Sequence, residues 1–146
     1  MLPNNFVLLG HLIFTSIMTG VIWVIQIVHY PSFHFIEKDL YTAFQKFHMN
    51  KISIIVMPIM LAELITGIML FFDNSFKSPF LTISIIILVL IWLITGVFFT
   101  KVHNELIAGY QELVVNQLIA MNWIRTLLWT LRLLLLTCFV YLHFSR

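Results

Sequence analysis

Long apolar segments alternate with short polar stretches along this chain, and the apolar segments set its architecture. Four of them stand out, at residues 6–29, 52–72, 80–102 and 118–142. At about 1.5 Å of helical rise per residue, each is long enough to cross a hydrocarbon core of roughly 30 Å. The pattern therefore predicts an all-α fold, an integral membrane four-helix bundle that forms one transmembrane domain over residues 1–146, and it excludes a soluble domain.

The stretch between the first two segments has a helical pattern of its own. Tyr30-Pro31 ends the first helix, because proline lacks the backbone N–H that a continuing helix needs. Polar residues, Gln45 among them, then lie opposite apolar residues that recur at helical spacing: Phe33, Ile36, Leu40, Phe44 and Phe47. This pattern predicts an amphipathic helix that lies in the membrane interface between the first and second spans.

A few charged side chains interrupt the apolar spans. Arg125, Arg132 and His143 are separated by 7 and 11 residues, which places them on one stripe of the last helix. A stripe that faced lipid could not carry two arginines, so we expect it to face the protein interior. Glu63 lies near the middle of the second span, at a depth comparable to that of Arg132. An ion pair between Glu63 and Arg132 is the simplest way to satisfy both charges.

These charges allow more than one role, and we take Glu63, Arg125 and Arg132 as the candidate catalytic residues. The Glu63–Arg132 pair either fixes the helix register alone or handles protons or a substrate anion. Without a carboxylate partner, Arg132 would hold an anionic group such as a propionate or a phosphate. Arg125 lies near the membrane boundary, where its side chain can instead extend to lipid phosphates.

Composition and charge narrow the possible partners. With 8 Lys and Arg against 6 Asp and Glu, the chain lacks the basic patch that nucleic-acid binding requires. Its single cysteine, Cys138, excludes an internal disulfide. Most basic residues follow the first and third spans, whereas Lys77 and Arg146 lie on the other side. The positive-inside rule then predicts a multi-pass protein of the bacterial-type inner membrane with both termini outside. The lipid bilayer is its expected partner, and the pattern leaves room for a homo-oligomer.

Histidines gather at the cytoplasmic ends of the predicted helices. His29, His48 and His103 are expected to meet there as the bundle closes, and three imidazoles suffice to hold a transition metal. His11 lies five helical turns from His29, towards the opposite side of the membrane. The alternative is that each histidine satisfies a lipid headgroup or a backbone carbonyl at the membrane boundary.

The last span also carries the densest group of polar and aromatic side chains. Asn122 and Trp123 precede Arg125, and Trp129 follows it by about one turn. We take Asn122, Trp123 and Trp129 as candidate contacts to a bound cofactor. Core packing is the alternative, and for Trp129 it is the favoured one.

A series of features in the first two spans is shared with a known family. The features are an early histidine, a tryptophan, a Tyr-Pro break and a Met-Pro pair ahead of a glycine: His11, Trp23, Tyr30-Pro31, Met57-Pro58 and Gly67. This series resembles the small membrane protoporphyrinogen oxidase family, which binds haem b, and His103 falls where that family also places a histidine. The resemblance implies haem at His11 or His103. The opening of the last span, at residues 122–126, looks more like the four-helix anthrone oxygenase-like membrane family.

The expected function is redox chemistry on a hydrophobic, quinone-like substrate, assisted by haem b or a histidine-bound transition metal. In that interpretation the arginines bind anionic groups and Glu63 relays protons or balances Arg132. The alternative is a transporter or channel-like protein that moves protons, anions or lipid headgroups along Glu63 and Arg132. A further alternative is a structural membrane subunit whose buried charges fix the helix register.

Overall fold

The structure is a computed structural model that describes residues 2–73 and 77–145, with Met1, residues 74–76 and Arg146 outside the described residues. Helices make up almost all of the described chain. Four continuous helical segments are long and apolar enough to cross a membrane. The elements are α1 (Leu2–Val24) with a π-helical turn (Ile25–His29) and a 3-10 helix (Pro31–Phe35), α2 (Lys38–Phe72), α3 (Pro79–Ile94) with a second π-helical turn (Thr95–Phe99) and α4 (Thr100–Ile107), and α5 (Glu112–Phe144). The predicted all-α membrane bundle is confirmed.

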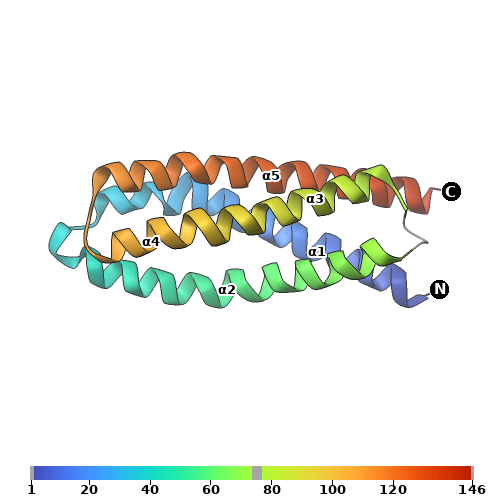
Figure 1. Cartoon of the computed structure of the whole chain (residues 1–146), viewed down its shortest axis with the longest axis horizontal. Coiled ribbons are helices and arrows are strands. Elements are labelled where there is room, and N and C mark those ends of the chain that lie inside the picture. Colours follow the sequence, from blue (N-terminus) through green and yellow to red (C-terminus); the bar gives the residue numbers. More distant parts are fainter. Residues whose placement is uncertain (1, 74–76, 146) are drawn as a thin grey trace.

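The four helical segments lie side by side along one long axis, and α4 extends the line of α3 (Figure 1). Contacts are most extensive between α1 and α2, between α3 and α5, and between α1 and α5. α1 begins and α5 ends at the same end of the bundle (Figure 1). The two ends of the chain therefore lie on the same side of the bundle, as the predicted topology requires.

The interfacial helix expected between the first two spans is not a separate element. Residues Lys38–Phe72 form a single helix of 35 residues. The physical reason is that no proline or glycine interrupts the chain between Lys38 and Pro58, so the helix runs from the interface into the membrane without a break. The predicted faces are correct only in part. Phe33 is fully buried and Phe44 packs against the apolar core, as expected. However, Gln45 is fully buried, whereas Leu40 and Phe47 are 59% and 61% exposed.

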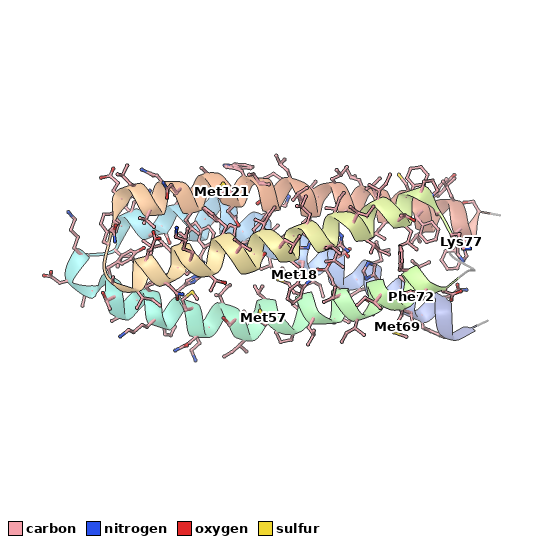
Figure 2. All side chains as sticks on the ribbon, in the orientation of Figure 1. Met18, Met57, Met69, Phe72, Lys77 and Met121 are labelled. Carbon is pink, nitrogen blue, oxygen red and sulfur yellow. The ribbon has the colours of Figure 1, made fainter. Side chains whose placement is uncertain are left out.

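The outer surface of the bundle is apolar. Met57, Met69 and Phe72 on α2 are 49%, 52% and 77% exposed, whereas Met18 on α1 is completely buried (Figure 2). The other long helices carry exposed Ile, Leu, Val and Phe in the same way. Such a surface is costly in water and matches the hydrocarbon of a bilayer. Inside, the packed apolar side chains form two groups. The larger group runs along the bundle, and the smaller one lies at the end where α1 begins and α5 ends.

At Gly67, side chains from α1 and α3 lie close to the α2 backbone. A Cβ at this position would lie 3.2 Å from His11 Cε1 and 3.2 Å from Leu88 Cδ2. Gly20 on α1 offers a matched comparison, because a Cβ there would meet nothing within 4 Å. Small residues at such contacts let membrane helices approach closely.

We expect Gly67→Leu to destabilise the bundle by about 2 kcal/mol, since overpacking forces the helices or their side chains apart. Gly20→Leu is the control and is expected to leave stability unchanged within about 0.5 kcal/mol. The measurement is loss of helical ellipticity as SDS is titrated into mixed micelles. Equal midpoints for the two variants would show that the α2 contact at Gly67 is not tight.

Candidate functional site

Buried polar side chains form two groups at different heights in the bundle. The ion-pair cluster consists of His11, Thr15, Glu63, Thr66, Trp129 and Arg132. The histidine cluster consists of His29, Tyr30, Gln45, His48, His103 and Arg125. Most of these positions were singled out in the sequence, which predicted the Glu63–Arg132 pair and the meeting of the three histidines but not the other contacts.

The predicted ion pair is confirmed, and it is completely buried. Arg132 Nη1 donates to Glu63 Oε1 at 2.6 Å, with both side chains at 0% exposure. The same carboxylate accepts from Thr15 Oγ1 at 2.7 Å and from Trp129 Nε1 at 3.2 Å. The carboxylate therefore accepts from three donors on two helices, α1 and α5.

Arg132 also reaches the helices that do not carry Glu63. Its Nε donates to the carbonyl oxygen of Ser84 on α3 at 3.0 Å, and its Nη2 contacts Thr15 Oγ1 at 3.4 Å. Nη2 lies 3.2 Å from His11 Nε2 as well. Since Arg132 extends from α5 to α2, α3 and α1, one side chain fixes the relative height of all four helices.

His11 is held in one tautomer by its two neighbours. Arginine can only donate, so His11 Nε2 accepts from Arg132 and the proton resides on Nδ1, which lies 2.8 Å from Thr66 Oγ1. Both ring nitrogens are therefore engaged. An axial haem ligand needs one free ring nitrogen, so His11 in this arrangement does not fit the haem that the family resemblance implies.

Trp129 connects the two clusters. Its Nε1 donates to Glu63 on one side, and its ring lies 5.3 Å from Arg125 Cζ on the other. The favoured sequence interpretation of Trp129 as core packing is incomplete, because the fully buried ring also carries this polar contact.

The three histidines predicted to converge do lie together. His29 Nε2 and His48 Nδ1 are 2.7 Å apart, and the rings of His48 and His103 are 5.5 Å apart between centroids. His103 is turned towards other partners. Its Nδ1 lies 2.9 Å from Gln45 Nε2, and its Nε2 lies 3.3 Å from the Tyr30 hydroxyl. The sequence analysis missed both partners.

Arg125 lies inside the bundle rather than at the lipid phosphates, so the interpretation that its side chain extends to the headgroups is wrong. It is 5% exposed, and its Cζ lies 4.1 Å from the Phe99 ring centroid. Nη1 donates to Asn122 Oδ1 at 3.4 Å, and the Tyr30 hydroxyl lies beside the guanidinium. Aromatic faces attract a cation, but they do not neutralise it.

Asn122 and Trp123 take different places, although they are neighbours in the chain. Asn122 Nδ2 donates to Gln26 Oε1 at 2.8 Å, which orients Asn122 Oδ1 towards Arg125. Trp123 is 42% exposed and packs edge-on against Trp23 on the outside of the bundle. His143 is also remote from both clusters and lies 3.4 Å from Asn5.

Both π-helical turns lie at the histidine cluster. The Tyr30 N–H donates to the Ile25 carbonyl oxygen at 2.9 Å, a five-residue step that adds one residue to the turn carrying His29. The second π-helical turn ends at Phe99, the residue that stacks on Arg125. Such single π-helical turns recur at functional sites, because the extra residue re-aims the side chains beyond it.

An apolar groove between α1 and α2 leads to His29 and His48. It has a volume of about 470 Å³ and extends along α1 from Gly20 to His29. Several of its lining residues are half or more exposed, Val24, Phe47 and Ile55 among them, so the groove opens on the surface that faces lipid. Lys51, three residues after His48 on α2, also lines the groove, and its Nζ lies 5.9 Å from the Phe47 ring centroid. We call this feature the α1–α2 groove.

Three buried polar atoms of the histidine cluster have no hydrogen-bond partner among the described residues. They are Gln45 Oε1, His48 Nε2 and Arg125 Nε. Buried polar groups are rarely left unpaired, so each such atom in a native structure calls for an explanation. The ion-pair cluster differs, because among the described residues none of its members has such an atom, and every charged atom of Glu63 and Arg132 is bonded.

The side chains do not form a metal site in this arrangement. Within residues 2–73 and 77–145, no three His, Cys, Asp or Glu side chains are grouped so that they could hold a metal ion. The cause is visible in the cluster, where His29 and His48 bond to each other while His103 faces Gln45 and Tyr30. The structure thus gives no support to a three-histidine metal centre.

A spacing rule could have found Gln45. Tyr41, Gln45 and His48 are spaced by four and three residues, so they share one face of a helix, and the structure buries that face. Tyr30 offered no comparable signal, because its position depends on the π-helical turn before it.

Comparison of the chain with protein-family models, with curated proteins and with solved structures gives no match. The family resemblances of the sequence therefore stay predictions, and function has to be argued from the geometry.

We expect Arg132→Met to destabilise the protein by about 3 kcal/mol, because it leaves the Glu63 carboxylate buried without its charged partner. The double variant Glu63→Met with Arg132→Met is expected to recover part of that loss. Unfolding in SDS mixed micelles, measured for both single variants and the double variant, gives the coupling energy. Lys101→Met, at an exposed position, is the control. Simple additivity of the two single variants would contradict a strongly coupled pair.

Proposed function

We propose that this protein binds a hydrophobic small molecule from the bilayer in the α1–α2 groove and exchanges protons with the polar head of that molecule at the His29–His48 pair. One observation carries the proposal: a lipid-facing apolar groove ends at two mutually bonded histidines. Ligand sites typically combine an apolar lining with a few convergent polar groups. A quinone- or phenol-like molecule, with an apolar tail and a hydroxyl or carbonyl head, has matching chemistry.

The pair has the hydrogen bonding that proton exchange needs. If His48 Nδ1 donates to His29 Nε2, then His48 Nε2 is an unprotonated acceptor, and it is the buried nitrogen without a partner. A proton taken up at His48 Nε2 is matched by one passed from His48 Nδ1 to His29 Nε2. Imidazole is suited to this role, because one ring nitrogen can accept a proton while the other donates one.

Redox chemistry of quinone-like molecules moves protons together with electrons, and the histidine pair would serve the proton side of such a reaction. We therefore propose an oxidoreductase as the reaction class, in which a redox partner outside the histidine pair, such as haem b or an electron-transfer protein, gives or takes the electrons. The chemistry of the pair itself needs no metal.

Gly20 allows a direct test of the groove. It lines the groove, and a Cβ there meets open space, so a larger side chain would occupy the site of the ligand rather than disturb the bundle. We expect Gly20→Leu to weaken binding of a decyl-substituted benzoquinone roughly tenfold or more. The measurement is equilibrium dialysis with the protein in lipid nanodiscs, corrected for partition into protein-free nanodiscs.

Gly96→Leu is the matched control, because a Cβ at Gly96 also meets nothing within 4 Å and Gly96 lies outside the groove. The control is expected to bind the quinone like the unaltered protein. Equal binding by both variants would contradict the groove as the ligand site.

The cofactor prediction has its own test. If the protein carries haem b or a histidine-bound metal, the purified protein is expected to show a Soret band or a stoichiometric metal content. Ultraviolet–visible spectroscopy and elemental analysis make the measurement. A colourless, metal-free protein that retains its helical content would rule out the cofactor and leave the proton-exchange proposal intact.

A further inference from the structure

The polar side chains that line the α1–α2 groove are all of basic residue types. They are His29, His48 and Lys51, and the remaining lining is apolar or glycine. In the part of the chain that the structure describes, no Asp or Glu lines the groove. Lys51 carries a positive charge. After the proton uptake proposed above, His48 Nε2 carries a hydrogen and donates, so the head of an amphiphile that has lost its proton would lie against a cation and a hydrogen-bond donor.

The nearest buried carboxylate is already committed. Glu63 belongs to the ion-pair cluster, where Arg132, Thr15 and Trp129 occupy both of its oxygens. The other acidic side chains that lie on α2, α4 and α5 are exposed: Glu37, Asp39, Glu105 and Glu112. Hence none of these groups balances the basic side chains of the groove.

A second buried cation adds to the imbalance. Arg125 is 5% exposed, and among the described residues it forms no salt bridge. It lies beside Tyr30, whose ring is 6.2 Å from that of His48 between centroids, so it lies behind the histidines that line the groove. Its Nε has no partner. A charge in a low-dielectric interior acts over a longer range than in water, so the field of Arg125 extends towards the groove.

We infer that the ligand of the α1–α2 groove is an amphiphile with an anionic head, such as a carboxylate or a phenolate, which is bound against Lys51 and the histidine pair. This inference rests on the proposed function and names the ligand class of the same site. The apolar tail would lie along α1 towards Gly20, a length of about 14 Å for nine residues of helix. Binding would also supply the negative charge that Arg125 lacks.

Two probes of equal tail length separate charge from hydrophobicity. Decanoate and decanol differ only in the head, so their affinities are compared in zwitterionic nanodiscs at a pH above the carboxyl pKa. We expect decanoate to bind roughly tenfold more tightly, which is the scale of one charge-assisted hydrogen bond. Lys51→Gln should remove most of this preference, Lys51→Arg should retain it, and Lys46→Gln, an exposed lysine outside the groove, should leave it unchanged.

The outcomes distinguish the inference from the function on which it rests. Equal binding of both probes, with both weakened by Gly20→Leu, would overturn the anionic ligand and keep the groove as a binding site. Binding of either probe that Gly20→Leu does not weaken would overturn both proposals. A decanoate preference that survives in Lys51→Gln would overturn the inference as well, because the positive charge that recognises the carboxylate would then not be that of Lys51.

Discussion

The buried salt bridge between Glu63 and Arg132 is the interaction on which the arrangement of this bundle depends. A bilayer offers no water to a polar group, so two charges at this depth must find each other and fill their remaining hydrogen bonds within the protein. Arg132 does so with partners on α1, α2 and α3. Apolar packing alone allows helices to slide and rotate, whereas these directional bonds admit one register.

The two arginines of α5 contrast sharply within one helix. Each guanidinium nitrogen of Arg132 has a partner, one of them the Glu63 carboxylate, as expected of a structural group. Arg125 is almost as buried, but it has aromatic faces, one amide oxygen and a neighbouring tyrosine. Unpaired buried polar atoms concentrate around it and its histidine neighbours. Satisfied charge at one height and unsatisfied charge at another separate the part of the bundle that holds the fold from the part with capacity for a ligand.

The histidine cluster and the groove gain significance from their relation to the bilayer. A groove that opens on the apolar outer surface suits the proposed ligand, a molecule dissolved in the membrane, and His29 and His48 lie near the end of the bundle where α1 passes into the 3-10 helix. The π-helical turns place His29 and Phe99 around this end. A regular helix would rotate the residues beyond each turn by about 100°, away from their present partners.

The sequence by itself determined the all-α membrane fold, the four spans and the pairing of Glu63 with Arg132, because hydrophobic length is a local property and each charge at that depth had one plausible partner. It also placed His29, His48 and His103 at one end of the bundle. Only the tertiary structure decided which nitrogens are engaged, that Gln45 and Tyr30 hold His103, that Arg125 turns inwards and that a groove leads to the histidines. The physical reason is that periodicity defines the face of a helix, whereas the partners of that face depend on helix rotation, on the added residue of a π-helical turn and on packing between segments distant in the chain. In the stretch after Pro31 periodicity placed Phe33 and Phe44 correctly but Leu40 and Phe47 wrongly, because in a bilayer the apolar side of a helix is free to face outwards.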